Sequence, residues 1–351
     1  LHQPRRTSGI PSMTTMVRAA VLTNYFEVAE YLGLQTPPLL AQTGLSRALL
    51  QDPEQRIPVD AAVRLLEESA AACGSFNFGL RMAESRQLSD FGSVSLVRTL
   101  HGTLRHALQA LVHYRRLLNG ALAIIVEEAG RMVIIREEVV TESHQFRSQA
   151  NELAIGVMFR FCAALLGTHW RPRSVNFTHE APDDLQLHRR MFGCKLEFGS
   201  EFNGIVCPAI DLDAANPHAD PAMARYAQRY LDSLQSESEP SFLFDVRRAI
   251  YLLLPMGRAT IELIAQAMGM NVRTLQRRLE ENHATFSELI NNVRCDLVTR
   301  YMENPGYSLA HIADLLGYSV PSSFTRWFAA QFGMPPASWR AQHKAAARKG
   351  M

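Results

Sequence analysis

The sequence predicts an α+β N-terminal domain, followed by an all-α C-terminal domain with two helix-turn-helix motifs joined by a long connector helix. Three observations predict this organisation. A chain of 351 residues is longer than one ordinary domain. The first two thirds mix helical and strand-like patterns, and the last third contains an internal repeat of helical character. With 47% hydrophobic and 20% charged residues, the composition is that of a folded globular protein.

Residues 1–15 contain no apolar run, so they are expected to form a disordered leader and not a secretory signal. Helical periodicity follows over residues 17–32, 58–73 and 104–118. The second of these helices has Pro58 near its start, a position that proline favours.

A β-hairpin is predicted next, because two β-rich runs flank a short turn at Glu128-Ala129-Gly130. The runs are Ala121–Glu127 and Arg131–Glu137. A helix is expected over 147–166, with short strands over 174–178 and 205–208 that join the sheet. These elements complete an α+β domain over residues 16–234.

A further helix is predicted from Pro221 to Leu234, and the polar residues after it indicate a domain boundary. The linker is placed at residues 235–244, the second domain at 245–340 and a tail at 341–351. The charge differs between the two parts. Residues 240–351 hold 13 Lys/Arg and 8 Asp/Glu, a net charge of +5, whereas the remaining residues have a net charge of −3. A basic domain is expected of a phosphate-binding module.

Five cysteines without a Cys-x-x-Cys pair indicate reduced thiols in a cytoplasmic protein. The longest apolar stretch, residues 152–166, is interrupted by Arg160 and is too short to cross a bilayer, so no membrane association is expected. No sequence motif of an enzyme is present, and no catalytic residue, metal or cofactor is predicted.

The internal repeat pairs residues 261–279 with residues 309–328. Ile264-Ala265 matches Ile312-Ala313, and Gly269 matches Gly317. A small alanine lets two helices cross closely, and a glycine can adopt the positive φ that ends a helix tightly. Each copy therefore predicts a helix-turn-helix motif.

The second helix of each copy is expected to begin at an N-cap, Asn271 or Ser319. Leucines or phenylalanines four residues apart then bury one face. The opposite face carries Arg273, Gln276 and Arg277 in the first copy, and Ser322, Ser323 and Arg326 in the second. Arginine and glutamine can make bidentate contacts to guanine and adenine edges in the major groove.

Residues 286–303 read as one helix between the copies, ended by Asn304-Pro305-Gly306. A rigid connector of this kind holds the two recognition helices in a fixed relation. One protomer can then read two successive major-groove segments roughly 34 Å apart.

These motifs resemble those of the AraC/XylS family over residues 245–340. The shared pattern is Ile-Ala-x3-Gly-x-(Asn/Ser)-x-Arg-x-Leu-x-Arg-x-Leu, a connector helix, and Ile-Ala-x2-Leu-Gly-Tyr-Ser-x4-Phe-x-Arg-x-Phe. It closes with Gly333-Met-Pro335-Pro336-x2-Trp339-Arg340. The chain departs from the family at His283, where glycine is common, and at Val298, where alanine is preferred. Local backbone strain is expected at His283.

The N-terminal part is similar to the sensor domain of the ornithine-utilisation-regulator-like branch of that family, which is named an arabinose-binding domain. The similarity lies in fragments such as Phe78-Gly79-Leu80, Trp170-Arg171-Pro172 and Phe192-Gly193-Cys194. It does not identify a sugar as ligand. Seven aromatic residues of this part could line an apolar pocket, or they could simply form the hydrophobic core. They are Phe76, Phe78, Phe91, Phe159, Phe161, Trp170 and Phe177. Arg147 and His144 are a weaker candidate site for an anionic effector.

The resemblance implies a sequence-specific, DNA-binding transcription regulator, usually an activator. Its implied partners are double-stranded promoter DNA, a small-molecule effector of unknown identity, RNA polymerase and a second copy of the chain. The predicted DNA-binding residues are Asn271, Arg273, Thr274, Gln276, Arg277, Ser319, Pro321, Ser322, Ser323, Thr325 and Arg326. Two alternatives stay open. One is a constitutive regulator whose N-terminal domain only dimerises. The other is a ligand-binding protein or enzyme with a helix-turn-helix tail that does not bind DNA.

Overall fold

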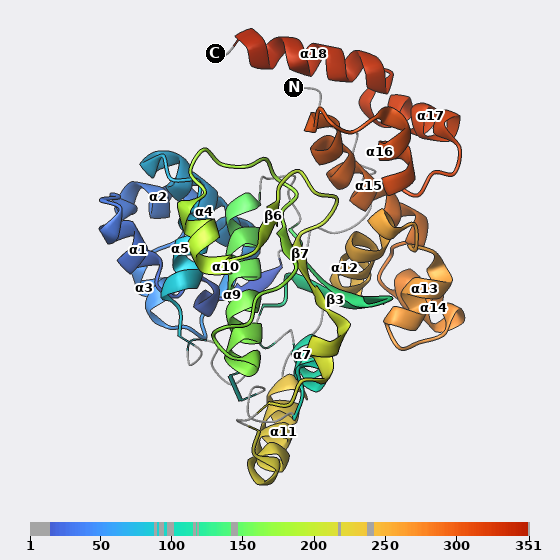
Figure 1. The fold of residues 1–351 in the computed structure, drawn as a ribbon. Helices are drawn as coiled ribbons and strands as arrows, with labels where there is room; N and C mark the ends of the chain where they lie inside the picture. Colours follow the sequence, from blue (N-terminus) through green and yellow to red (C-terminus); the bar gives the residue numbers. More distant parts are fainter. Residues whose placement is uncertain are drawn as a thin grey trace. The chain divides into compact units, whose positions relative to one another are not determined.

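The computed structural model describes residues 15–87, 90, 95–96, 102–114, 117, 119–141, 147–216, 219–236 and 242–349. The chain divides between Glu239 and Pro240 into two compact units (Figure 1). The residues predicted as a leader lie outside the described residues, apart from Thr15. The proposed linker has helical residues at both ends, since one helix ends at Ser236 and the next begins at Phe242.

The N-terminal unit contains helices and strands in mixed order. Its strands are β1 (Met16–Arg18), β2 (Arg56–Pro58), β3 (Leu122–Ala129), β4 (Met132–Val139), β5 (Ser174–Asn176), β6 (Lys195–Glu197) and β7 (Gly204–Pro208). Its helices are η1 (Ala19–Leu22), α1 (Tyr25–Tyr31), α2 (Thr36–Thr43), α3 (Arg47–Gln51), α4 (Val59–Cys73), α5 (Phe78–Ser85), α7 (Leu104–His113), α9 (Ser148–Leu166), α10 (Gln186–Phe192), η3 (Ala209–Asp213) and α11 (Pro221–Ser236).

The described part of the C-terminal unit is entirely helical. Its elements are α12 (Phe242–Leu253), η4 (Leu254–Met256), α13 (Ile261–Ala267), α14 (Val272–Glu281), α15 (Phe286–Glu303), α16 (Leu309–Leu315), α17 (Pro321–Phe332) and α18 (Pro336–Lys349). The predicted connector coincides with α15. The tail predicted from residue 341 is instead helical as far as Lys349, because α18 continues through it.

A mixed sheet of order β3-β4-β7-β5-β6 forms the centre of the N-terminal unit. Its neighbouring strands are antiparallel except for β5 and β6, which are parallel. The predicted hairpin is confirmed, with Ala129 paired to Met132 and a turn at Gly130-Arg131. Gly130 has φ +64°, which a two-residue hairpin turn requires.

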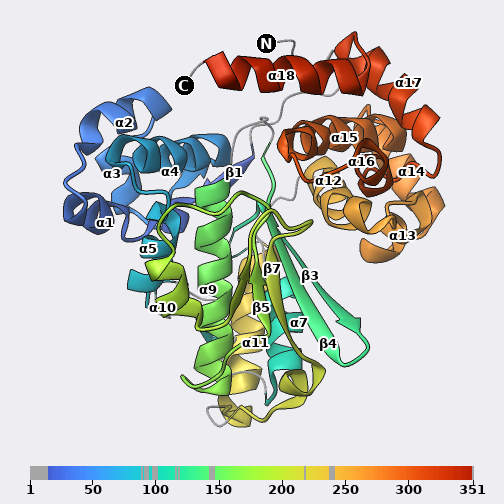
Figure 2. The same cartoon turned by 45° about the horizontal axis from the view of Figure 1, so that its top comes forward.

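Helix α9 is the core helix of this unit. It contacts β4 and β7 on one side and α4 and α5 on the other, and Figures 1 and 2 show it lying along the sheet. Two glycines allow α5 to approach closely. A Cβ at Gly79 would lie 2.0 Å from the carbonyl oxygen of Gln149, and one at Gly156 would lie 2.6 Å from Cβ of Ala83.

By length and composition alone, α9 could also cross a membrane. Its mean hydropathy is 1.2, but 67% of the relevant window is buried inside the unit. Burial of this kind is typical of the core helix of a folded domain.

The helix predicted over residues 17–32 is wrong as one continuous element, although α1 (Tyr25–Tyr31) lies within it. Met16–Arg18 pair as strand β1 with Arg56–Pro58, and a 3₁₀ turn follows before α1 begins. Asn24 has φ +67°, which interrupts a right-handed helix. Pairing with residues 40 positions away in the sequence therefore overrode the local periodicity.

A buried carboxylate joins two helices and a loop of the N-terminal unit. Oε1 of Glu152, on α9, lies 3.0 Å from Nε2 of His179 and 2.8 Å from Nε2 of His188 on α10. Burial raises the pKa of Glu152, but the hydrogen bonds and charges of the two histidines outweigh it, so the pKa lies below its ordinary value. His179 thus has a structural partner.

We expect Glu152→Gln to lower the free energy of unfolding of the N-terminal unit by roughly 1.5–3 kcal/mol at pH 7, the value of a hydrogen bond to a charged group. The lowered pKa of Glu152 means that its carboxylate stabilises the fold above the unfolded-state pKa. The advantage of the wild type should therefore shrink as the pH falls below about 4.5. Urea unfolding at pH 7 and pH 4 measures both effects.

Glu180→Gln, at an exposed position beside His179, is the control, and its free energy of unfolding should change little. Equal stability of Glu152→Gln and wild type at pH 7 would contradict the assignment.

Candidate nucleic-acid interface

The C-terminal unit is organised by a buried carboxylate on its connector helix. Asp296 of α15 accepts hydrogen bonds from Nη2 of Arg247 at 2.5 Å and from the hydroxyl of Tyr251 at 2.6 Å, both on α12. Burial would lower the pKa of Arg247, but the charge of Asp296 outweighs it and the pKa is raised. Helix α12 also contacts α13, and η4 at its end contacts α16. The first motif therefore packs on α12 and the second on η4 and α15, and the contacts of Asp296 join α12 to α15.

The first motif consists of α13 and α14. Thr260 caps α13, and its Oγ1 accepts a hydrogen bond from the amide of Leu263. Ala265 is buried, and Gly269 has φ +67° in the turn, as the repeat predicts. Asn271 caps α14, since its Oδ1 accepts from the amide of Thr274 at 2.8 Å.

Helix α14 has one buried and one exposed face. Leu275 and Leu279 are buried, whereas Arg273, Gln276 and Arg277 are exposed. The guanidinium of Arg277 lies 3.7 Å from Glu281, and both side chains are largely exposed, so this ion pair is weak. A shallow hollow runs along the turn at the start of the helix, lined by Gln266, Gly269, Met270, Asn271 and Thr274.

The second motif, α16 and α17, differs from the first at the start of its second helix. Gly317 has φ +73°, as predicted. Ser319, however, is not the N-cap. Val320 occupies that position without a side-chain cap, and Pro321 is the first helical residue. The fixed φ of proline suits the first helical position, and this places the start of α17 one residue later than predicted.

Helix α17 is anchored by aromatic side chains. Phe324 and Phe328 are buried and contact each other, and Phe328 stacks on Phe332 with ring centroids 4.4 Å apart. Its outward positions Pro321, Ser322, Thr325 and Arg326 are exposed, and Ser323 is half-buried. Hence the eleven predicted contact residues lie in two groups, around the starts of α14 and α17. Nine of them are exposed, and Thr274 and Ser323 are partly covered.

The sequence matches two families. Residues 33–216 match the family described as the arabinose-binding domain of AraC transcription regulator, N-terminal. Residues 264–342 match the helix-turn-helix domain family. The transcriptional regulator VirS of Mycobacterium tuberculosis is 30% identical over 329 residues, which cover 93% of this chain and 97% of VirS. The chain belongs to the AraC family of transcription regulators.

Two further relatives show how the similarity is distributed. The ornithine utilization regulator of Pseudomonas aeruginosa is 24% identical over 89% of this chain and 92% of its own length. The transcriptional activator AggR of Escherichia coli is 28% identical, but only over 22% of this chain and 30% of its own length. As an AraC-family member, the chain is a DNA-binding transcription regulator and not an enzyme.

Two arginines of this AraC-family domain hold the second motif in place. Arg294 was missed in the sequence, and Arg340 was recognised only as part of the closing pattern. Nε of Arg294, on α15, donates to the carbonyl of Leu316 at 2.9 Å, and its guanidinium lies 4.3 Å from the ring centre of Tyr318. Nη1 of Arg340, on α18, donates to the carbonyl of Tyr307 at 2.7 Å. One carbonyl at the end of α16, that of Leu316, and one in the turn before α16, that of Tyr307, are thereby satisfied.

The departure from the family pattern at His283 has the predicted geometry. His283 has φ +54°, the left-handed conformation that glycine adopts most easily. The chain then enters α15 through a capping box, in which Thr285 and Glu288 bond to each other's backbone amides. Val298, the other departure, is fully buried in α15.

We expect Asn271→Ala to lower the unfolding free energy of the C-terminal unit by about 1 kcal/mol, because α14 loses its N-cap. Ser319→Ala is the matched control in the second motif. It should be within about 0.5 kcal/mol of wild type, since Ser319 is exposed and caps no helix. Chemical unfolding of both variants without DNA provides the comparison. An equal loss in the two variants would contradict the assigned helix starts.

Proposed function

We propose that the C-terminal unit recognises a specific promoter element by placing α14 and α17 in successive segments of the major groove. The observation that supports this is the pair of exposed polar faces on two helices that share one buried scaffold. The proposed contact residues are Asn271, Arg273, Thr274, Gln276 and Arg277 in the first motif, and Ser319, Pro321, Ser322, Ser323, Thr325 and Arg326 in the second.

The two motifs offer different chemistry to DNA. Arg273, Gln276 and Arg277 are long side chains suited to bidentate contacts with guanine and adenine. The second motif has shorter hydroxyl side chains, a proline that can contact a thymine methyl group, and one arginine, Arg326. Nη2 of Arg326 lies 3.5 Å from Oγ of Ser323, the limit of a hydrogen bond, so the arginine is free to turn toward a base.

The net charge of +5 over residues 240–351 supports contacts to phosphates as well as bases. Arg278 differs from its neighbours on α14. Its guanidinium lies 5.6 Å from the ring centre of Phe242 on α12, so it packs toward its own unit. We assign it no contact with a base.

For the N-terminal unit we propose that it senses a small metabolite and pairs two copies of the chain. The match to a sensor-domain family supports sensing. Activation of transcription, through contact with RNA polymerase in the cytoplasm, is the proposed output, and the name of the relative AggR as an activator favours it. An effector acts only if it binds two arrangements of the regulator unequally. A purely dimerising N-terminal unit remains the alternative, and it would show no stabilisation by any metabolite.

We expect Arg273→Ala and Arg326→Ala each to weaken binding of the full-length protein to its selected operator by about 1–3 kcal/mol and to relax base preference at separate positions. Arg278→Ala, on the same helix as Arg273, is the matched control and should keep the base preference of the wild type. Fluorescence anisotropy at several salt concentrations, on operators from a random-site selection, measures affinity and its salt dependence.

The binding of the two arginine variants and of the control shows whether one helix, both helices or neither reads the DNA. Loss in both variants, with the control retained, supports two reading helices. The proposal fails if no sequence is bound above the non-specific level. If Arg326→Ala has no effect, the assignment of α17 as a reading helix is wrong.

A further inference from the structure

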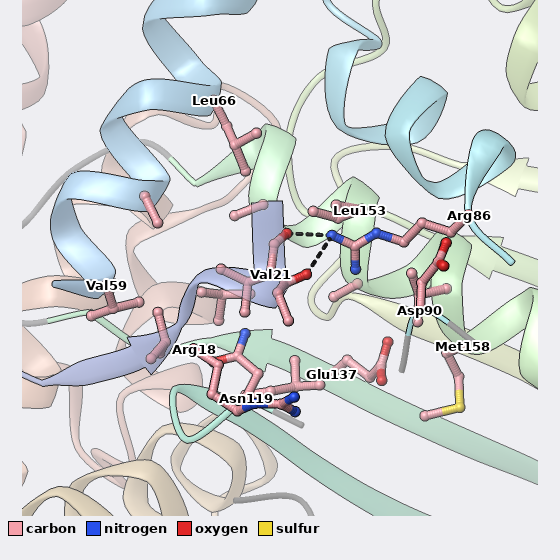
Figure 3. Close-up of a pocket in the computed structure, with 18 of the residues that line it drawn as sticks. Arg18, Val21, Val59, Leu66, Arg86, Asp90, Asn119, Glu137, Leu153 and Met158 are labelled. Carbon is pink, nitrogen blue, oxygen red and sulfur yellow. Dashed lines mark hydrogen bonds between the residues drawn. The ribbon is translucent and has the colours of Figure 1, made fainter. Parts of the chain in front are cut away.

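The N-terminal unit contains a partly open cavity with a volume of about 110 Å³. Its walls come from η1 and the end of β1, from α4, from β3 and β4, and from α9 (Figure 3). Most of the lining is aliphatic, with Val59, Leu66, Leu122, Leu153 and Met158 among its residues. Since one buried water needs roughly 10–15 Å³ of such space, the cavity has room for a ligand of on the order of eight non-hydrogen atoms.

This cavity is not the aromatic pocket that the sequence suggested. Of the seven aromatic residues considered, Phe161 lines it. Phe78 and Phe177 are fully buried in the core, Phe76 is exposed, and Phe91 lies outside the described residues. Arg147 and His144 were the other candidate site, for an anionic effector. Arg147 is buried and donates to Oγ1 of Thr141 at 3.2 Å, and His144 is not among the described residues.

One carboxyl group in the cavity wall has no partner. Glu137, on β4, is 3% exposed, and neither of its carboxylate oxygens has a hydrogen-bond partner in the described structure. Burial raises the pKa of Glu137 well above its ordinary value. The next residue shows the contrast, because Glu138 accepts from Nδ2 of Asn203 at 2.9 Å and from Nδ2 of Asn151 at 3.4 Å. A buried polar group without a partner is costly, so its presence in a ligand-sized cavity calls for an explanation.

The two arginines that line the cavity have partners, but one nitrogen, Nε of Arg86, has none in the described structure. Arg18 donates to both carboxylate oxygens of Glu54 and to the carbonyl of Leu117. Arg86 donates to the carbonyls of Ala20 and Val21, with Asp90 beside it (Figure 3). Burial lowers the pKa of Arg86 and the charge of Asp90 raises it in part, so that the pKa is about 10. Neither arginine bonds to Glu137, so the carboxyl group of Glu137 lacks a hydrogen-bond donor.

We propose that this cavity is the effector site and that it binds a small, largely apolar amine whose amino group donates to Glu137. This rests on the proposed sensing role of the N-terminal unit. An ammonium group supplies both the donors and the positive charge that an unpaired carboxylate requires. The aliphatic walls take up a hydrocarbon body of matching size. A carboxylate ligand would instead bring a second negative charge beside Glu137, and apart from Nε of Arg86 the hydrogen bonds of the two arginines already go to carbonyls and to Glu54.

The probes are two matched series applied to the full-length protein without DNA. The first is hexylamine, hexan-1-ol and hexanoate, and the second is 2-phenylethylamine, 2-phenylethanol and phenylacetate. We expect the amines to raise the melting temperature of the N-terminal unit, because a ligand that binds the native state stabilises it. The alcohols should raise it less, and the carboxylates not at all. Equal or greater stabilisation by the carboxylates, or no stabilisation by either amine, overturns the proposal.

Two variants test the role of Glu137 directly. Glu137→Gln keeps the size of the side chain and removes the carboxylate, and Glu137→Leu removes the polar group altogether. Without probe, Glu137→Leu should melt at a higher temperature than wild type, since an unpaired buried carboxyl is gone. In both variants amine affinity should fall about tenfold or more, as expected for the loss of a hydrogen bond to a charged group.

A control variant and a variant that narrows the cavity make the test independent of the substitutions at Glu137. Glu127→Gln, on β3 and outside the cavity wall, should bind the amines as the wild type does. Ala154→Leu, on α9, narrows the cavity without changing Glu137 and should also weaken amine binding. Unchanged amine affinity in Glu137→Gln or in Ala154→Leu would show that the amines bind elsewhere.

Failure of this inference is distinguishable from failure of the proposed function. Melting temperatures are read without DNA, so they report on the cavity even if no operator is found. Amines that bind at Glu137 but leave operator affinity unchanged support the site and contradict its sensing role. Operator binding without any amine effect retains the regulator and removes the amine site.

Discussion

Helix α15 carries Asp296 into the interior of the C-terminal unit, where Arg247 and Tyr251 of α12 donate to its carboxylate. Both motifs depend on this contact. Helix α12 contacts the first motif through α13, while α15 contacts the second through α16 and the side chain of Arg294. A buried ion pair is weak evidence for stability, but it fixes the register of the helices it joins, because a shifted helix leaves a charge unpaired. The relation between the two recognition helices follows from that register.

Much of the DNA-binding unit could be predicted from the sequence because its signals are local. Gly269, Gly317 and the connector helix depend on residues within one turn of each other. The prediction of Ser319 as N-cap is wrong for a reason that is also local. Pro321 takes the first helical position, so the N-cap of α17 is Val320. Arg294, Arg340 and Asp296 could not be recognised in advance, because their roles depend on contacts more than 20 residues away.

The N-terminal unit was less predictable because its packing is made by distant segments. Residues 17–32 have helical periodicity, yet β1 forms there through pairing with β2. The strand β4 contains Glu137 and Glu138 in succession, and alternation along a strand puts them on opposite faces without saying which face meets the cavity. Only the assembled sheet, with α9 packed against it, shows that the carboxyl group of Glu138 has hydrogen-bond partners and that of Glu137 has none.

We propose that α15 holds α14 and α17, the proposed reading helices, at a fixed separation. The most direct measurement is the affinity of the full-length protein for its selected operator after 5 or 10 base pairs are inserted between the two protected half-sites. We predict that both insertions lower affinity by about tenfold or more. Five base pairs turn the second half-site to the other face of the duplex, and ten move it one turn, roughly 34 Å, beyond the reach of a rigid unit. Affinity that is unchanged by either insertion would contradict the account, because only one helix would then be reading the DNA.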